Sequence, residues 1–239
     1  MAENITLMTY NVHSCVGTDR KLDPGRIAQV IAQAKPDIVA LQEVDVGRSR
    51  TGGLDQARAI ASLLKMQAHF HPALTVAEEL YGDAIITALP TGAKKAGLLP
   101  SMGEPRGAIA LEIFVSDQKL LVINTHLGLR GRERIQQMNT LLGAGWIGDH
   151  DGPVILCGDF NAIPASAAYR AAARRLRDVQ QVNWTGFRPT FPSRFPVMRL
   201  DHIFVTEAIG VVDAYVPNDP LARMASDHLP LVSILALSR

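Results

Sequence analysis

This sequence contains few cysteines and has no large excess of positive or negative charge. The only two cysteines, Cys15 and Cys157, lie far apart and show no metal-binding spacing, so we expect two small buried side chains. The net charge is only +1, unlike the strongly basic balance of proteins that coat nucleic acid by neutralising its phosphates. A local basic patch is still compatible with this balance.

Long apolar runs and several familiar catalytic motifs are also absent. The first residues include an acid and no apolar run, so they match neither a secretion signal nor a membrane anchor. We therefore expect a cytoplasmic protein without stable membrane insertion. The chain has no Gly-x-x-x-x-Gly-Lys-Ser/Thr loop, no His-Glu-x-x-His, no Gly-x-Ser-x-Gly and no Cys-x-x-Cys, which argues against the enzyme classes that those motifs mark.

The material for a large core is present. Apolar residues make up 47% of the 239 residues and charged residues 20%, which is close to the usual globular mixture. No repeat, low-complexity stretch or linker-like run divides the chain. We therefore predict one domain over residues 1–239.

Short apolar, β-branched runs alternate with helical patterns along the chain. Apolar residues at three- and four-residue spacing predict amphipathic helices at 24–34, 54–64, 132–147 and 165–175. Runs with the length and composition of strands lie at 5–10, 38–41, 84–87, 108–115, 120–124, 154–157, 202–205 and 231–237. Because strands outnumber helices and many connections are short, the pattern favours an α/β (α+β) fold with mixed sheets and outer helices.

Polar residues with metal or phosphate chemistry stand beside six of these apolar strands. Each of them alone is more simply explained as a turn or a cap. The six segments are Thr9-Tyr10-Asn11, Leu41-Gln42-Glu43, Asn124-Thr125-His126, Gly158-Asp159-Phe160-Asn161, Leu200-Asp201-His202 and Ser226-Asp227-His228. Together they supply the oxygen ligands that a hard cation prefers, and also the acid, base and donors that phosphoryl transfer requires.

The chain resembles the endonuclease/exonuclease/phosphatase superfamily, to which deoxyribonuclease I belongs, in its short bacterial form. The resemblance rests on seven blocks that occur in the family's order over more than 200 residues. They are Thr-Tyr-Asn-Val-His at 9–13, Leu-Gln-Glu-Val at 41–44, Tyr-Gly-Asp-Ala-Ile at 81–85, Asn-Thr-His-Leu at 124–127, Gly-Asp-Phe-Asn at 158–161, Arg-Leu-Asp-His-Ile-Phe-Val at 199–205 and Ser-Asp-His-Leu-Pro at 226–230. The resemblance implies a four-layer sandwich, with two mixed sheets face to face and helices on the outer faces.

The resemblance also implies roles for individual residues. Glu43 matches the principal Mg²⁺ ligand, and Asn11 and Asp227 match residues near the ion, directly or through water. Mn²⁺ is the alternative ion. Position 13 departs from the family, because it is His13 where nucleases of the exonuclease III type have an aspartate.

Five further residues match the family's catalytic positions. Asp201 and His228 resemble its Asp/His pair, in which the carboxylate fixes the tautomer of the imidazole. Asp159 matches the carboxylate that orients or deprotonates water, and Asn161 matches the donor to a phosphate oxygen. His126 would stabilise developing charge or protonate the leaving oxygen. The choice of general base stays open at this point.

Three further residues are candidates for substrate binding. Asp83 either pairs with His126 and raises its pKa or simply begins a strand. Arg106 and Arg199 lie in segments that resemble those of short bacterial members, and either arginine grips phosphate or forms a structural salt bridge.

The sequence therefore predicts a Mg²⁺-dependent phosphoester hydrolase. The expected partner is a small phosphorylated molecule or a phospholipid headgroup, because the catalytic set is complete and the net charge is not strongly basic. A DNA or RNA nuclease of the same fold is the alternative, and a non-catalytic phosphate-binding module is a third hypothesis. We expect a monomer.

Overall fold

Two six-stranded mixed sheets form the middle of the molecule. The computed structural model describes residues 3–182 and 189–237. The strands are β1 (Glu3–Asn11), β2 (Ile38–Val46), β3 (Gln67–Val76), β4 (Glu79–Thr87), β5 (Thr91–Leu99), β6 (Arg106–Val115), β7 (Gln118–His126), β8 (Val154–Asp159), β9 (Arg177–Asp178), β10 (Asp201–Val205), β11 (Ile209–Tyr215) and β12 (Leu231–Leu237). Their order is β11-β12-β1-β2-β4-β3 in the first sheet and β5-β6-β7-β8-β10-β9 in the second.

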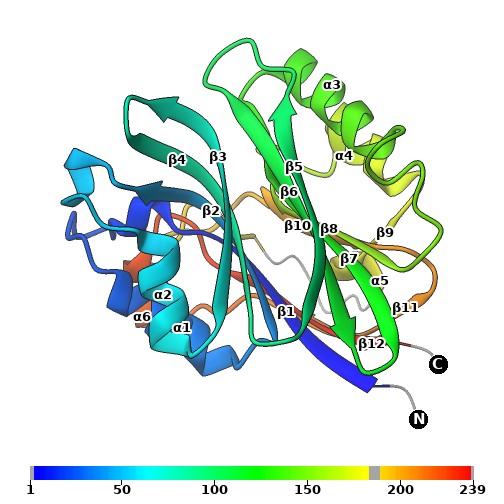
Figure 1. The fold of residues 1–239 in the computed structure, drawn as a ribbon, viewed down its shortest axis with the longest axis horizontal. Helices are drawn as coiled ribbons and strands as arrows, with labels where there is room; N and C mark the ends of the chain where they lie inside the picture. The colour runs from blue at the N-terminus through cyan, green and yellow to red at the C-terminus, as the bar shows by residue number, and fades with distance from the viewer. Residues whose placement is uncertain (1–2, 183–188, 238–239) are drawn as a thin grey trace.

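Helices cover the outer face of each sheet, so the predicted four-layer sandwich is confirmed (Figure 1). The helices are α1 (Pro24–Ala34), α2 (Gln56–Leu64), α3 (Gly131–Leu142), α4 (Ala167–Ala173), α5 (Val179–Val182) and α6 (Pro220–Ala225), with short 3₁₀ turns η1 (His13–Cys15) and η2 (Ser49–Thr51). Helices α1, α2 and α6 lie on the first sheet, and α3 and α4 on the second.

Apolar side chains fill the space between the sheets. Ile5, Leu7 and Ile38 of the first sheet pack in one buried cluster with Ile109 and Val122 of the second. Alternate residues of each strand face this space, and the residues between them face the outer helices. A second cluster joins the first sheet to its outer helices, and a third cluster joins the second sheet to its own. The three clusters together form the core.

Each sheet contains one parallel strand pair, and this topology brings the polar segments to one edge. Strand β1 runs parallel to β2, and β7 runs parallel to β8 with His126 opposite Asp159. The carboxyl ends of parallel strands meet at the same edge. Strand β10 is antiparallel to β8, so its first residue, Asp201, lies opposite Asp159 at that edge.

The structure also contains elements that the sequence pattern did not predict. These elements are β3, β5, β9, β11, α5 and α6. Strand β5, with the sequence TGAKKAGLL, is an edge strand that exposes most of its side chains, and it therefore lacks an apolar pattern. The predicted helix at 132–147 ends at Leu142, because Gly143 follows in extended backbone and Gly145 takes a positive φ of 82°.

Candidate active site at the strand-end edge

Glu43 is aimed into the site by an irregularity in its strand. The pairing register of β2 with β4 shifts between Leu41 and Val44, and Glu43 takes a positive φ of 58°. A bulge re-aims a side chain, and a non-glycine residue with positive φ is uncommon and costs free energy. Asn161 has the same feature, with a φ of 47°. Both strained positions carry residues that the sequence motifs single out.

Gly158 is required where β8 approaches β7. Its φ is 141°, and a Cβ atom added there would lie 1.8 Å from the backbone oxygen of Thr125. Only glycine fits this position. The first residue of the Gly-Asp-Phe-Asn block therefore has a packing function, and the close strand approach positions Asp159 and Asn161 beside His126.

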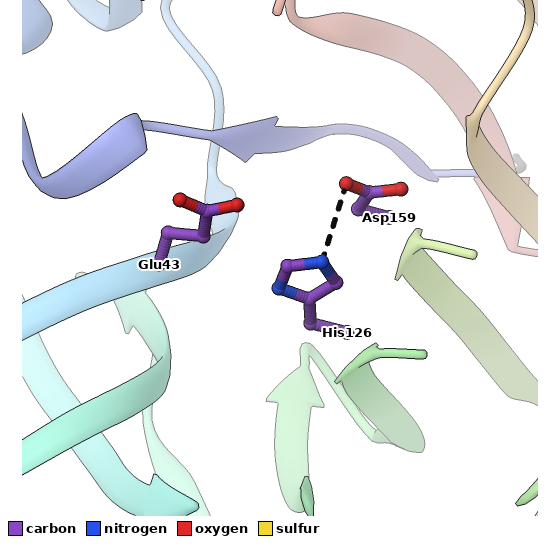
Figure 2. A group of neighbouring side chains, drawn as sticks. All are labelled: Glu43, His126 and Asp159. Carbon is purple, nitrogen blue, oxygen red and sulfur yellow. Dashed lines mark ion pairs between the residues drawn. The ribbon is translucent and has the colours of Figure 1, made fainter. Parts of the chain in front are cut away.

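The structure brings Glu43, His126 and Asp159 together at this edge (Figure 2). One ligand atom of each lies within 4.8 Å of the others. The amide nitrogen of Asn11 donates to Glu43 at 2.8 Å and to Asp159 at 3.0 Å. Within the described part of the chain, Glu43 forms no ion pair with a basic side chain. Two carboxylates near each other without a side-chain cation between them fit a hard divalent ion.

His228 and Asp201 form a buried pair next to this group. Nδ1 of His228 lies 2.8 Å from Asp201, and Nε2 lies 3.6 Å from Asp159. Burial alone would lower the pKa of His228, but Asp201 and Asp159 outweigh burial and raise it to about 10. Burial also raises the pKa of Asp159, against the opposing effect of His228. His228 is therefore a fixed positive charge at neutral pH.

His126 has the opposite electrostatic character. Burial, Arg106 and His228 hold its pKa well below the usual value, so its imidazole is neutral. Nδ1 lies 3.2 Å from a guanidinium nitrogen of Arg106, and Nε2 lies 2.9 Å from the amide nitrogen of Asn161 and 3.5 Å from Asp159. A neutral imidazole can accept from only one of these two donors. Because Arg106 is a cation that keeps its protons, we assign the acceptor to Nδ1 and the ring proton to Nε2.

This contact gives Arg106 a testable role in positioning His126. Arg106→Met should raise the pKa of His126 and introduce the Nδ1–H tautomer, because the cation that excludes a proton from Nδ1 is gone. Nitrogen-detected NMR of His126 measures both changes. Arg106→Lys keeps the charge and should retain the Nε2–H form. An unchanged tautomer and pKa in Arg106→Met would contradict the assignment.

Asp83 does not pair with the ring of His126, and the pKa of His126 is lowered rather than raised. The first alternative for Asp83, a pair that raises the pKa of His126, is therefore wrong. Asp83 lies inside β4 and is buried. The backbone N–H of His126 donates to it, and the guanidinium of Arg106 acts electrostatically on both residues. Burial raises the pKa of Asp83 to about 8, so its carboxyl group is largely protonated at neutral pH.

Asp83→Asn is expected to stabilise the protein in mild alkali. The raised pKa of Asp83 contributes stability below the unfolded pKa of 3.8, and this contribution is lost as pH rises through about 8. The amide keeps the acceptor and cannot ionise, so at about pH 9 the variant should exceed the parent by on the order of 2 kcal/mol in free energy of unfolding. Urea unfolding at several pH values measures this difference. A variant that is less stable by the same amount at every pH would contradict it.

Arg199 is not brought to the site. Its guanidinium lies 2.5 Å from the buried carboxylate of Asp178, which also accepts from the hydroxyl of Tyr169. Arg199 therefore forms a structural salt bridge in this fold. Arg106 does line the site cavity, and it also forms an ion pair with Glu104 at 2.7 Å.

Asp227 lies at the margin of the site. Its side chain is 40% exposed, and one oxygen lies 3.9 Å from Nδ1 of His13. In the described residues, Asp227 belongs to neither of the two acid and histidine groups whose ligand atoms lie within 4.8 Å of one another. Its expected place near a metal ion, directly or through water, thus remains a proposal.

The cavity above these residues has a volume of about 460 Å³ and includes residues that sequence reasoning missed. Arg50 lines it, lies over the ring of Tyr81 at 5.4 Å, and forms a bidentate pair with the buried Asp45 at 2.8 Å. Tyr81 belongs to one of the matched blocks. The sequence around Arg50 shows only a glycine-rich turn, so nothing local distinguishes it from a surface arginine.

Comparisons with known proteins identify the family of this chain. The chain matches the model of the Endonuclease/Exonuclease/phosphatase family over residues 8–228. The uncharacterized protein YbhP of Escherichia coli (strain K12) is 34% identical over 134 residues, which cover 54% of this chain and 51% of that protein. The match thus spans about half the length of this curated relative.

Solved structures share the fold across nearly the whole chain. An endonuclease/exonuclease/phosphatase from Beutenbergia cavernae DSM 12333 has a TM-score of 0.82 and 26% identity, covering 98% of this chain and 72% of that one. A mannosyl-6-phosphatase of Bacteroides thetaiotaomicron VPI-5482 has a TM-score of 0.77 and 22% identity, covering 97% and 99%. With the family model matched over most of its length, the chain belongs to the endonuclease/exonuclease/phosphatase family, whose members hydrolyse phosphoester bonds.

Proposed function

We propose that this protein is a Mg²⁺-dependent hydrolase of phosphoester bonds in a small phosphorylated molecule or a phospholipid headgroup. The observation that carries the proposal is the convergence of Glu43, Asp159, His126 and the Asp201–His228 pair on one cavity edge. This set combines acids for a metal ion, a fixed positive charge for phosphate and a neutral donor. A non-catalytic phosphate-binding module would not require all these groups.

The residues present fit a bound divalent ion. Glu43 and Asp159 would hold it, with the amide nitrogen of Asn11 positioning both carboxylates and water completing the coordination. When bound, Mg²⁺ supplies positive charge to a phosphoryl oxygen and lowers the pKa of coordinated water. Mn²⁺ has the same ligand preference and is the alternative ion.

The remaining side chains would orient water and stabilise the transition state. Asp159 accepts a proton from, or orients, the attacking water, while His228 places its positive charge at a phosphate oxygen. Nε2–H of His126 donates to an oxygen on which negative charge develops. Because the imidazole is neutral, His126 acts as a hydrogen-bond donor in this account, and protonation of the leaving oxygen falls to water.

The substrate class is tested by a panel of hydrolysis assays with and without Mg²⁺. The panel contains aryl phosphodiesters, sugar phosphates, phospholipids, and single- and double-stranded nucleic acids. We expect turnover of a small phosphoester or a phospholipid. Cleavage of nucleic acid alone, with affinity that falls steeply with salt, would establish the nuclease alternative. No Mg²⁺-dependent turnover in any class would overturn the proposal.

A further inference from the structure

Exposed apolar side chains lie on loops next to the residues of the site. Leu129 lines the cavity and is 73% exposed, and Phe195 is 78% exposed. These two are the most exposed large apolar side chains in the described part of the chain. Exposed apolar groups that gather at one place on a surface mark a site of interaction.

Hydrogen bonds fix the loops that carry these side chains beside the cavity. Leu127, two residues before Leu129, accepts from the amide of Asn161 at 2.9 Å, and the exposed Ile163 follows Asn161 by two residues. On the other side, Ser193 donates to the backbone oxygen of Asp227 at 2.7 Å. Phe195 and the exposed Val197 lie in the loop that Ser193 anchors. We call Leu129, Ile163, Phe195 and Val197 the apolar tips.

The Phe195 loop is also attached to the catalytic residues themselves. The ring of Phe191 lies against the imidazole of His228, with 4.8 Å between the ring centroids. Thr190 accepts the backbone N–H of Leu229 at 2.7 Å. The loop that carries Phe195 therefore packs against His228, and Leu129 lines the same cavity as His228.

Positive charge accompanies the apolar tips. Arg130 and Arg132 follow Leu129 at the start of α3, both are exposed, and their guanidinium groups form no ion pair within residues 3–182 and 189–237. Glu104, an exposed acid that lines the same cavity, is neutralised by its ion pair with Arg106. The loops beside the cavity therefore carry exposed apolar side chains and two cations that are unpaired among the described residues, while the acids Glu43 and Asp227 belong to the site itself.

We propose that the apolar tips, together with Arg130 and Arg132, dock this face on an anionic phospholipid surface. Apolar side chains between cationic ones suit the boundary between charged headgroups and acyl chains. Nucleic acid offers phosphates to the arginines but no apolar phase for Leu129, Ile163 and Val197, so it fits the patch less well. No helix among the described residues is long and apolar enough to cross a membrane, and the docking is peripheral.

The functional consequence of docking rests on the proposed function, because docking would bring headgroup phosphates to the cavity where they would be hydrolysed. The test of docking is kept separate by measuring binding in EDTA, where hydrolysis does not intervene. Full-length protein is co-sedimented with vesicles of phosphatidylcholine, with and without phosphatidylglycerol, and is titrated with a fluorescent single-stranded oligonucleotide.

We expect binding to the anionic vesicles. Leu129→Ser/Phe195→Ser should weaken it by about 10-fold or more, because two apolar side chains no longer enter the interface. Arg130→Ala/Arg132→Ala should weaken it by roughly 30-fold, and added salt should weaken parent binding. Matched controls are Leu63→Ser and Arg58→Ala/Arg174→Ala, which alter exposed residues outside the patch and should bind as the parent does.

Leu63 is a suitable control because α2 ends far from the cavity. It precedes β3, whose first residue Gln67 pairs with Thr87. Thr87 pairs in turn with Ile38, the first residue of β2, whereas Glu43 lies toward the other end of that strand. Parent protein that does not bind anionic vesicles, or patch variants that bind them as tightly as the controls, would overturn the proposal. So would oligonucleotide binding that the patch variants abolish while vesicle binding is unaffected.

Hydrolysis of a soluble aryl phosphodiester separates this proposal from the proposed function. Phe195→Ser should keep the parent rate on that substrate while weakening vesicle binding. Vesicle binding by a parent protein that hydrolyses nothing would contradict the proposed function alone. Hydrolysis of the soluble ester without vesicle binding would contradict the docking alone.

Discussion

Glu43→Gln is expected to reduce kcat/KM for a phosphoester by about 1,000-fold and to weaken Mg²⁺ binding, since the carboxylate charge is removed at constant shape. The parent places this carboxylate beside Asn11 and within 4.8 Å of a ligand atom of Asp159. Isothermal titration calorimetry gives the metal affinity, and steady-state kinetics at saturating Mg²⁺ gives the rate. Both quantities should change in the same variant.

Glu112→Gln is the matched control for this variant. Glu112 lies on β6 and pairs with Lys119 at 2.9 Å, away from the cavity. It should keep the parent's rate and Mg²⁺ affinity. If Glu43→Gln binds Mg²⁺ and turns over substrate as well as Glu112→Gln does, Glu43 is not a metal ligand.

Asp201→Asn is expected to lower kcat by about 100- to 10,000-fold, as for other histidines that lose their orienting carboxylate. Asp201 contacts Nδ1 of His228 at 2.8 Å, and both side chains are buried. Without that negative charge the pKa of His228 should fall from about 10 toward its ordinary range. The alkaline limb of the pH profile should therefore move to lower pH.

Asp178→Asn provides the control for removal of a buried charge. Asp178 is as buried as Asp201 but pairs with Arg199, outside the site. The variant should lose stability while keeping the parent's pH profile and most of its kcat. Equal losses of kcat in the two variants would mean that Asp201 acts through stability alone.

Much of the fold was predictable because buried strands carry their own pattern. The core strands β1, β2, β7 and β8 appear as apolar runs, and α1 begins at Pro24 as predicted, with Asp23 as its N-cap. The edge strands β3, β5 and β11 have few apolar residues in a regular order, because one side or one face of each meets solvent. Their existence depends on pairing partners that sequence periodicity does not reveal.

The candidate site was predictable as a set of residues but not as a network. The ordered blocks identify Glu43, Asp159 and His228, whereas the contact between Arg106 and His126 joins residues on two strands through side-chain geometry. Likewise, Arg199 has the same local character as a phosphate-binding arginine and differs only in its buried partner Asp178. Partners distant in sequence decide such roles, so the pairs could not be derived from local pattern.

The most direct test of the central claim is the rate of nitrophenol release from bis(p-nitrophenyl) phosphate by metal-depleted protein as Mg²⁺ is added. We expect almost no release without metal, a saturable rise with Mg²⁺, and a rate at least about 100-fold lower in Asp159→Asn. Equal rates with and without Mg²⁺, or equal rates in parent and variant, would contradict metal-dependent phosphoester hydrolysis at this site.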